Sequence, residues 1–407
     1  TTVRLITPQA GDALTALQTS FDGFTPATGI VVSARANRGD EVAADQIRGD
    51  TTADLLVVPQ PGVLALAAHD GPMDLTLYLD RFDLENAWGP GLTSLVSAGD
   101  DGAWPSSDGP VYGLWNKLDL KSLLWNDPTH FEADGHAKPT TWDETIDVSD
   151  RIVDSGGTPW CMGIKAGGPD DGWPATDVLE AVVLRQHGPD VYDAWWNHRI
   201  PFDDPRILES ARTMGQLVFS PGYVAGGSAV AARTAWAEGP FELAADPPGC
   251  WLLAQASFVS VFGPEQLTPF DFPVIEPESS SARVGAGTFV VALSDRPEVR
   301  AVVEFMATPE YGQVMAEAGS GFIPPHTGVD LGVIVDDDLR TMAELGHDAL
   351  VADQLRFDAS DMMPAEIGAD LMWKAMVEWF DQGPDELERI FAEVEAAWVA
   401  LESAPNG

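Results

Sequence analysis

The chain has 407 residues, of which 45% are hydrophobic, and its length suits two domains of ordinary size. This composition excludes a disordered chain, and no apolar run reaches the ~18 residues of a membrane span. There are 64 acidic and 22 basic residues, giving a net charge of −42. Binding of phosphates needs clustered cations, so nucleic acid is excluded as a partner, and anionic membranes would repel the chain.

The acidic composition leaves two interpretations open. A solvated acidic surface fits a protein that works in high salt, where self-repulsion is screened. The alternative is a merely acidic protein of high solubility. The chain begins with TTVRLIT and shows no basic region followed by an apolar signal segment. We therefore expect any export signal to have been removed or never to have been there.

The first sixty residues alternate between strand and helix patterns. Strands are predicted over 3–7, 29–35 and 53–59, with helices over 12–24 and 39–49 between them. This alternation predicts an α/β fold with a parallel sheet and crossover helices.

Ligands of such sheets bind at the loops after the strands. These loops contain no glycine-rich phosphate-binding motif, which argues against a nucleotide enzyme. Asp12 also lies in these loops, where it is either a ligand-binding residue or the N-cap of the following helix. The candidate ligand-binding residues of these loops are Gln9, Arg38, Asp40 and Gln60.

The middle of the chain is predicted to enter a second domain. Residues 111–127 have the pattern of a strand that leaves one domain for the other. A helix is predicted over 140–153, where Thr141 and Glu144 have capping-box spacing. Residues 158–167 are predicted to form a strand that ends in a glycine-rich loop.

The last third is predicted to be mainly helical. Residues 249–263 form a buried strand or helix, 284–293 a strand, and 295–319 two short helices with proline near each first turn. The final tract, 384–403, is predicted to bury one helical stripe. That stripe consists of Leu387, Ile390, Phe391, Val394, Trp398 and Leu401.

Several polar and aromatic residues stand out as candidates for a site. Asp119 and Lys121 alternate with leucines on a buried segment, which is costly unless they pair with each other or face a ligand. Among fourteen tryptophans, Trp173 is predicted to lie in a loop, and Trp251 to be either core or a ligand platform. Gly287 would let the backbone approach a ligand closely. Trp142, Trp160, Trp195 and Trp196 are expected to pack in the core.

The segment RFDASDMMPAEIGADLMWKAM, residues 356–376, places charged groups beside an indole. Arg356 and Asp361 precede a helix that carries Trp373. Charged hydrogen-bond partners next to a flat apolar face are what a polyhydroxylated ligand needs. The alternative is a structural Arg–Asp pair at a helix entry, which is a common arrangement.

Cys161 and Cys250 are the only cysteines, and their separation gives no metal-site spacing. Two buried free thiols are one alternative. In an exported protein, a long-range disulfide worth roughly 4 kcal/mol in the loop-entropy model is the other.

Eight sequence blocks in chain order resemble one family. They are DLLVVPQPG, YGLW with LDLKSLLWND, PTTWDE, GGTPWCMGI, GWPATD, DPPGCWLLAQASF, GAG with VVALSDRPEVRAVVEFMATPE, and RFDASDMMPAEIG with MWKAM. Together they resemble the extracellular solute-binding proteins of ABC sugar importers, in the α-glucoside-type branch. The resemblance covers the chain from about residue 50 to its end.

The resemblance implies a two-lobed periplasmic-binding-protein fold, with a hinge and a sugar held in the cleft between the lobes. We expect a first lobe of residues 1–117 plus about 262–310, and a second of about 118–261 plus 311–407. The resemblance also implies that Asp119 supplies a carboxylate to the sugar and that the segment of Trp251 supplies an aromatic ring.

The resemblance further implies an exported protein, extracellular or periplasmic, with a lipid anchor on the outer face of the membrane left open. Export makes the Cys161–Cys250 disulfide the expected state of the two cysteines. The expected partners are a small glycoside and the permease subunits of an ABC transporter, and we expect a monomer without a cofactor.

Three function classes follow. The first is a protein that captures an α-glucoside or related glycoside, of the trehalose, sucrose, maltose or glucosylglycerol type, and is not an enzyme. The second is a glycoside hydrolase, which needs two carboxyls ~5 to 10 Å apart across the bond, and no motif places such a pair. The third is a peptide or metal-ion binder on the same scaffold, although the seven histidines lack metal-ligand spacing.

Overall fold

The computed structural model describes residues 1–37, 43, 46, 49, 52–69, 71–99 and 104–404. The chain forms two compact units. The first consists of Thr1–Asp119 and Ala286–Leu355, and the second of Leu120–Gly285 and Arg356–Gly407. The chain therefore passes between the units three times.

Each passage from unit to unit lies on a strand. The passages fall within β4 (Leu114–Leu120), within β8 (Arg283–Ala292) and at the start of β9 (Leu355–Phe357). The boundaries differ from those expected, because residues 262–285 belong to the second unit and residues 311–355 to the first. The physical reason is that each crossing is made by an extended strand, a feature that composition does not mark.

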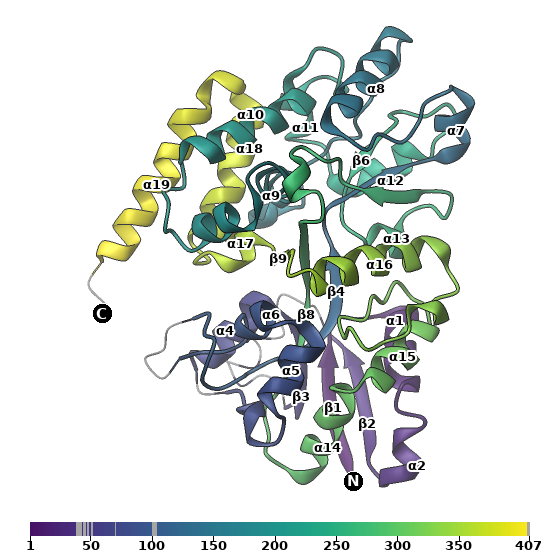
Figure 1. Ribbon diagram of the computed structural model, residues 1–407, viewed down its shortest axis with the longest axis vertical. Helices are drawn as coiled ribbons and strands as arrows, with labels where there is room; N and C mark the ends of the chain where they lie inside the picture. Colours follow the sequence, from purple (N-terminus) through teal and green to yellow (C-terminus); the bar gives the residue numbers. More distant parts are fainter. Residues whose placement is uncertain are drawn as a thin grey trace. The chain divides into compact units, whose positions relative to one another are not determined.

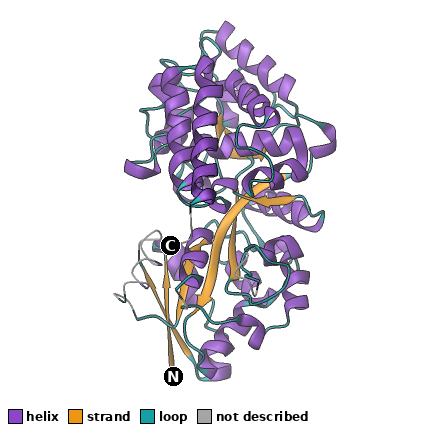
Figure 2. Cartoon of the chain, turned by 90° about the vertical axis from the view of Figure 1, so that its left-hand side faces the viewer, coloured by secondary structure: helices purple, strands orange, loops and turns teal. Residues whose placement is uncertain are grey.

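The first unit is built on a mixed sheet, whose strands run side by side in Figure 2. The order is β2 (Val31–Ala36), β1 (Thr2–Thr7), β3 (Leu55–Pro59), β8 and β4, and β9 also pairs with β8. Strand β1 pairs in parallel with both β2 and β3, which confirms the parallel pairing expected for these strands. The crossover helix predicted over 39–49 lies largely outside the described residues. The strand β8, predicted over 284–293, joins β3 in antiparallel orientation and so makes the sheet mixed.

Helices flank this sheet, and Figure 1 shows α1 beside β2 and α14 beside β1. The two helices predicted within 295–319 are confirmed as α14 and α15. The helices of the first unit that lie in the described part of the chain are α1 (Gly11–Thr19), α2 (Phe24–Thr28), α4 (Gln60–Ala67), α5 (Arg81–Trp88), α6 (Pro90–Ser94), α14 (Pro297–Met306), α15 (Pro309–Glu317) and α16 (Asp337–Val351).

The second unit is mainly helical and has a small antiparallel sheet (Figure 2). In this sheet β5 (Leu123–Asn126) lies between β6 (Leu253–Ala254) and β7 (Thr268–Asp271). The helices are α7 (Pro128–Ala133), α8 (Trp142–Asp154), α9 (Trp173–Trp196), α10 (Pro205–Phe219), α11 (Ser228–Ala231), α12 (Gly239–Leu243), α13 (Val259–Phe262), α17 (Ala359–Met362), α18 (Trp373–Gln382) and α19 (Leu387–Ser403). A π-helical turn, Ile367–Met372, leads directly into α18.

Local sequence signals explain several of these elements. Helix α8 begins with the predicted capping box, in which the Thr141 hydroxyl accepts from the Glu144 N–H and the Glu144 carboxylate accepts from the Thr141 N–H. Helix α19 buries the predicted stripe except for Leu401, which is 39% exposed in the last turn. The strand predicted over 158–167 is wrong: Trp160 and Lys165 make only isolated bridges, and the neighbouring Pro159 has no N–H to offer a ladder.

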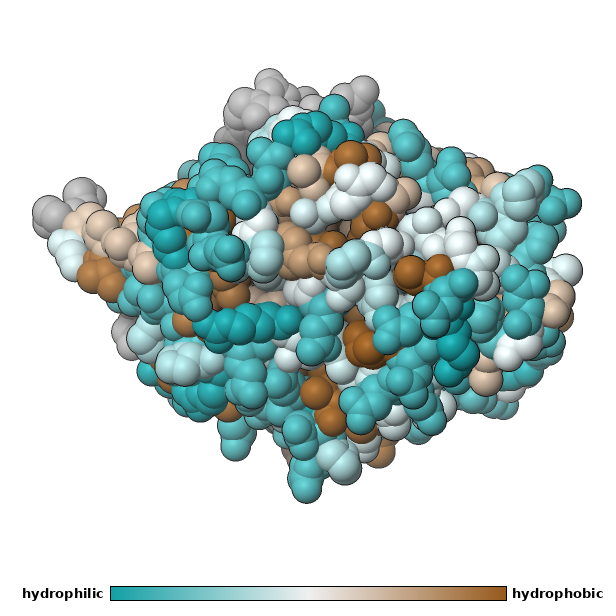
Figure 3. All heavy atoms as spheres, turned by 90° about the horizontal axis from the view of Figure 1, so that it is seen from above, coloured by the Kyte–Doolittle hydropathy of each residue, from teal (hydrophilic) through white to brown (hydrophobic). Residues whose placement is uncertain are grey.

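The core of the second unit is rich in tryptophan. Trp142, Trp160 and Trp195 are buried and Trp196 packs against the same cluster, which confirms their predicted packing role. The disulfide between Cys161 and Cys250 is present, with the two Cα atoms 5.2 Å apart. Among the described residues no helix has the length and apolar composition needed to cross a membrane. The face in Figure 3 is mostly hydrophilic, with small separate apolar patches.

Candidate functional site

A pocket of about 250 Å³ lies within the second unit. Its volume is close to the lower end of the range for ligand pockets in proteins, ~300 Å³. Four segments far apart in sequence meet there: the turn between β4 and β5, the start of α9, the residue before α13, and the loop and helices from Asp358 to Trp373. Its lining residues are Lys121, Trp173, Phe258, Asp358, Ser360, Asp361 and Trp373.

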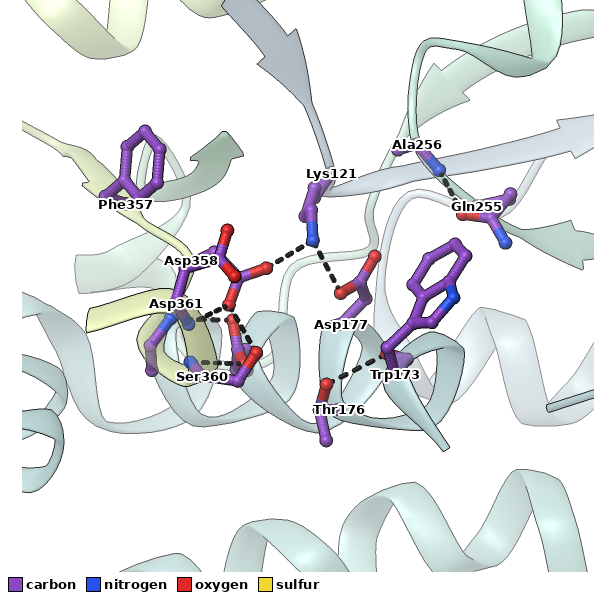
Figure 4. Close-up of polar contacts among 12 residues, drawn as sticks. Lys121, Trp173, Thr176, Asp177, Gln255, Ala256, Phe357, Asp358, Ser360 and Asp361 are labelled. Carbon is purple, nitrogen blue, oxygen red and sulfur yellow. Dashed lines mark hydrogen bonds and ion pairs between the residues drawn. The ribbon is translucent and has the colours of Figure 1, made fainter. Parts of the chain in front are cut away.

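Lys121 holds two carboxylates at the wall of this pocket. Its Nζ lies 2.8 Å from Asp177 Oδ1 and is also paired with Asp358 (Figure 4). The three side chains are only 11%, 5% and 2% exposed. Burial alone would lower the pKa of Lys121, but the two carboxylates raise it well above its ordinary value. Lys121 is therefore a fixed ammonium, and carboxylates of the described residues account for two of its three N–H donors.

The two carboxylates bound to Lys121 differ in their electrostatics. Burial raises the pKa of Asp177 to about 7 despite the neighbouring ammonium. Burial would also raise the pKa of Asp358, but Lys121 and the hydrogen bonds from Ser360 and the Asp361 N–H outweigh it and lower that pKa. Asp358 is thus the permanent counterion of Lys121.

Buried polar groups behind the pocket fix the loop that carries Asp358. Asp358 caps α17 by accepting from the Asp361 N–H at 3.0 Å and from the Ser360 hydroxyl at 2.7 Å. From α9, the carboxylate of Glu180 accepts the Ala359 and Ser360 N–H groups at 2.9 and 3.1 Å. Because these backbone donors are satisfied by a buried side chain, the loop is held rigidly in place.

Asp361 differs from the other acids of the cluster. Its side chain lines the pocket, and no hydrogen bond reaches its carboxyl from any residue that the structure describes. Burial and then the charge of Asp358 raise the pKa of Asp361 to about 8. It is therefore a carboxyl free to bond a ligand.

Aromatic rings form the apolar part of the lining. Trp173 meets Trp236 and Phe258 edge to face, with ring centroids 5.1 and 6.0 Å apart. Trp373 donates to the Ser360 hydroxyl at 3.4 Å, and all four rings remain partly exposed. Partly exposed indole faces beside carboxyls offer stacking surfaces for the C–H faces of a sugar ring.

Two glycines and a π-helical turn allow the segments to approach one another. Gly172 has φ +109, and a Cβ there would overlap the Trp373 carbonyl oxygen. A Cβ at Gly368 would overlap the Ser360 carbonyl oxygen in the same way. Gly368 lies in the π-helical turn before Trp373, and such turns occur often at functional sites.

The structure brings together four of the residues predicted from the sequence. Lys121, Trp173, Asp361 and Trp373 all line the pocket. Trp173 is not in a loop as predicted, since it is the first residue of α9. The predicted alternative of an Asp119–Lys121 pair is wrong, because Lys121 pairs with Asp177 and Asp358, and Asp119 pairs with Lys117 at 2.8 Å.

The other two predicted residues of the second unit lie outside the lining. Trp251 packs edge to face on His136, with ring centroids 5.5 Å apart. The Arg356 Nε lies 2.9 Å from both oxygens of Asp193, which is the structural pairing considered as an alternative.

Four of the predicted residues that the structure describes belong to the first unit. Gln9 bonds Thr7, and Gln60, fully buried at the start of α4, donates to the Leu95 carbonyl. Asp119 lies at the end of β4, and Gly287 permits a close approach of β8 to the Lys117 carbonyl. These residues do not line the pocket of the second unit, so their binding of ligand stays a prediction. Arg38 and Asp40 lie outside the described residues.

Sequence reasoning missed Asp177, Glu180, Phe258 and Ser360. The spacing of Asp177 and Glu180 was a usable signal, since residues three apart share one face of a helix. Both acids interrupt the apolar run of α9, where an uncompensated carboxylate would be costly. Among the residues that the structure describes, no cluster of three or more His, Cys, Asp or Glu side chains could hold a metal ion.

The chain is similar to known proteins over most of its length. The family model described as "Bacterial extracellular solute-binding protein" matches residues 8–313. The osmoprotective compounds-binding protein GgtB of Synechocystis sp. is 32% identical, over 97% of this chain and 92% of its own length. The alpha-glucosides-binding periplasmic protein AglE of Rhizobium meliloti is 31% identical, over 98% and 87%.

A solved structure supports the fold. The crystal structure of the bacterial solute receptor AcbH has a TM-score of 0.77 to this chain, with 15% identity over 98% of this chain and 99% of the receptor. At this identity the likeness shows the fold alone. It confirms the expected α/β fold of the two-lobed solute-binding proteins.

Proposed function

We propose that this chain, which belongs to the bacterial extracellular solute-binding proteins, captures an α-glucoside or related small glycoside for import by an ABC transporter. Two relatives of nearly full-length similarity support this ligand class. One is named for osmoprotective compounds and the other for alpha-glucosides. The candidates are trehalose, sucrose, maltose and glucosylglycerol.

The single observation that carries the proposal is the free carboxyl of Asp361 in a pocket flanked by the indoles of Trp173 and Trp373. A sugar ring presents hydroxyls at its edge and C–H groups on its faces. Asp361 and the third N–H of Lys121 would bond the hydroxyls, while the indoles would cover the faces. A site that pairs each hydroxyl rejects analogues that leave its own polar groups unpaired.

The further parts of the proposal come from the family. The ligand-loaded protein would deliver its cargo to permease subunits on the outer side of the cell membrane, as a monomer and without nucleic acid. Closure of the two lobes on the ligand, expected from the resemblance, stays a prediction.

Calorimetric titration with trehalose, sucrose, maltose, glucosylglycerol and glucose tests the ligand class. We expect one-to-one binding of at least one member. Replacing Trp373 by alanine should weaken that binding about tenfold or more, since burial of an indole face against the ligand is worth more than ~1.4 kcal/mol. The matched control is Trp196→Ala, which removes a partly buried indole outside the pocket lining.

Two results would contradict the proposal. If none of the five sugars bound, the proposed ligand class would be wrong. If Trp373→Ala and Trp196→Ala weakened binding equally, the pocket would not be the binding site. The alternative of a glycoside hydrolase is tested by incubation with a chromogenic α-glucoside. Hydrolysis of the chromogenic substrate would show that the protein is an enzyme and not only a binding protein.

A further inference from the structure

The pocket of the second unit carries more acids than bases. Within it and directly behind it lie four carboxyls, those of Asp177, Glu180, Asp358 and Asp361, and one ammonium, that of Lys121. If all were ionised, a partly dry cavity would hold a large net negative charge. Because burial penalises unpaired charge, it raises the pKa values of Asp177, Glu180 and Asp361.

The hydrogen bonds around the cluster distinguish its members. Asp177 and Asp358 share the Lys121 ammonium, and Asp358 also accepts from the Ser360 hydroxyl and the Asp361 N–H. Glu180 accepts two backbone N–H groups and lies 3.2 Å from the Tyr192 hydroxyl. Within the described part of the chain, only Asp361 lines the pocket with a carboxyl that receives no hydrogen bond.

The charged groups that act on Asp361 come from three elements. The β4–β5 turn contributes Lys121, α9 contributes Asp177, and the residue before α17 contributes Asp358. Lys121 is already shared by two carboxylates that are closely bound to it. The charge that acts most strongly on Asp361 is therefore the negative charge of Asp358, which favours the neutral form of Asp361.

We propose that Asp361 is a specificity residue that binds the ligand as a neutral carboxylic acid, donating its proton to one ligand oxygen and accepting a hydroxyl with the other. The inference rests on the proposed function and adds a chemical class to it: the ligand is an uncharged glycoside. An anionic sugar acid or sugar phosphate would add a negative charge beside Asp358. The raised pKa of Asp361, about 8, supports the neutral form at physiological pH.

A consequence is an affinity that depends on pH. If only the neutral acid binds, Kd is constant below the pKa of Asp361 in the empty pocket and rises tenfold per pH unit above it. Because the ligand covers the carboxyl and deepens its burial, the neutral form is favoured further when the ligand is bound. Binding in alkaline solution must then take up a proton.

The test is calorimetric titration of a glycoside that binds at pH 6.5, repeated up to pH 9.5. For the unaltered protein, Kd should rise about tenfold between pH 8.5 and 9.5. Asp361→Asn carries an amide that donates and accepts in the same place but does not ionise, so the rise due to this group should disappear. The matched control Asp370→Asn, at a 43% exposed carboxyl outside the pocket, should keep the rise.

A second measurement needs no variant. Titration at pH 9 in two buffers of different ionisation enthalpy should show uptake of about one proton per ligand bound. The proposal would be overturned if the Kd of the unaltered protein stayed constant to pH 9.5 or if binding took up no proton. It would also be overturned if the Asp361→Asn protein kept the full rise in Kd or bound no glycoside at any pH. Failure of the proposed function gives a different result, since no glycoside would then bind the unaltered protein at pH 6.5.

Discussion

Lys121 is the residue on which the polar wall of the pocket depends. It lies between Asp177 and Asp358, and all three side chains are almost entirely buried. Removing one member of a buried ion cluster leaves the others without compensation, at a typical cost of 3–5 kcal/mol. The cost falls when the orphaned acids take up protons, which the raised pKa of Asp177 already favours.

We therefore predict that Lys121→Met lowers stability by about 3 kcal/mol at pH 8, seen as a melting temperature about 5 to 10 °C lower. Without the ammonium, both acids have pKa values above those of the unfolded chain. Stability that depends on their protons is complete below the unfolded values and is lost as the pH rises. The deficit should thus shrink between pH 8 and pH 5.

Thermal unfolding followed by circular dichroism at the two pH values checks this prediction. The control is Lys374→Met, which removes a 62% exposed lysine paired with Asp370 and should change stability by less than about 1 kcal/mol. Equal deficits for the two lysine variants, or a deficit that grows towards pH 5, would contradict the role given to Lys121.

Prediction of single residues from the sequence succeeded where burial of a charged side chain without a partner would cost free energy. Lys121 stood out because a charge lay on an apolar strand pattern, and it does line the pocket. Its pairing with Asp177 and Asp358 was not predicted, because these acids are distant from it in sequence and only the fold brings them together. Arg356 illustrates the opposite case: its conspicuous position before a helix is explained by its pairing with Asp193.

At the level of elements, the start of α9 and the start of α18 meet at Gly172. This glycine has φ +109, and any Cβ would overlap the Trp373 carbonyl oxygen. At Gly383, with φ +103, no atom of the described residues other than its chain neighbours lies within 4 Å of the position of a Cβ. The two glycines thus share the same kind of backbone cost, of order 1–3 kcal/mol for another residue, but only Gly172 has a steric conflict in the site.

We predict that Gly172→Ala weakens glycoside binding about tenfold or more, because Trp173 and Trp373 must move apart by enough to lose ~1.4 kcal/mol of contact with the ligand. Gly383→Ala should lower the melting temperature but leave Kd unchanged. Calorimetric titration of both variants separates backbone strain from site geometry. A similar Kd for the two variants would show that the approach of α9 to α18 does not shape the site.

Elements with strong local signals were predictable from the sequence, and those held by distant contacts were not. The capping box of α8 and the apolar stripe of α19 each depend on residues that are close together in the sequence. Residues 158–167 have the apolar character of a strand, but the backbone there bonds scattered partners such as Leu252 and Thr234 rather than one ladder. Periodicity cannot distinguish these outcomes, since both bury the same side chains.

At the level of the whole molecule, charge is the dominant feature. A net charge of −42 is spread over two units, and the face seen in Figure 3 is mostly hydrophilic. Repulsion among like charges destabilises the compact state relative to the unfolded chain. The two interpretations of the composition, adaptation to salt and simple solubility, differ in how much stability depends on screening.

We predict that the melting temperature rises by several degrees between 0.01 and 0.3 M NaCl, because the screening length falls from ~30 Å to below ~10 Å over this range. Screening depends on ionic strength and not on the identity of the ions. KCl and sodium sulfate at matched ionic strength should therefore give the same rise below 0.1 M. A rise that differs between these salts in that range would point to specific ion binding, and a melting temperature that falls would show that ion pairs outweigh self-repulsion. A further rise beyond 1 M, where screening is nearly complete, would favour adaptation to high salt over simple solubility.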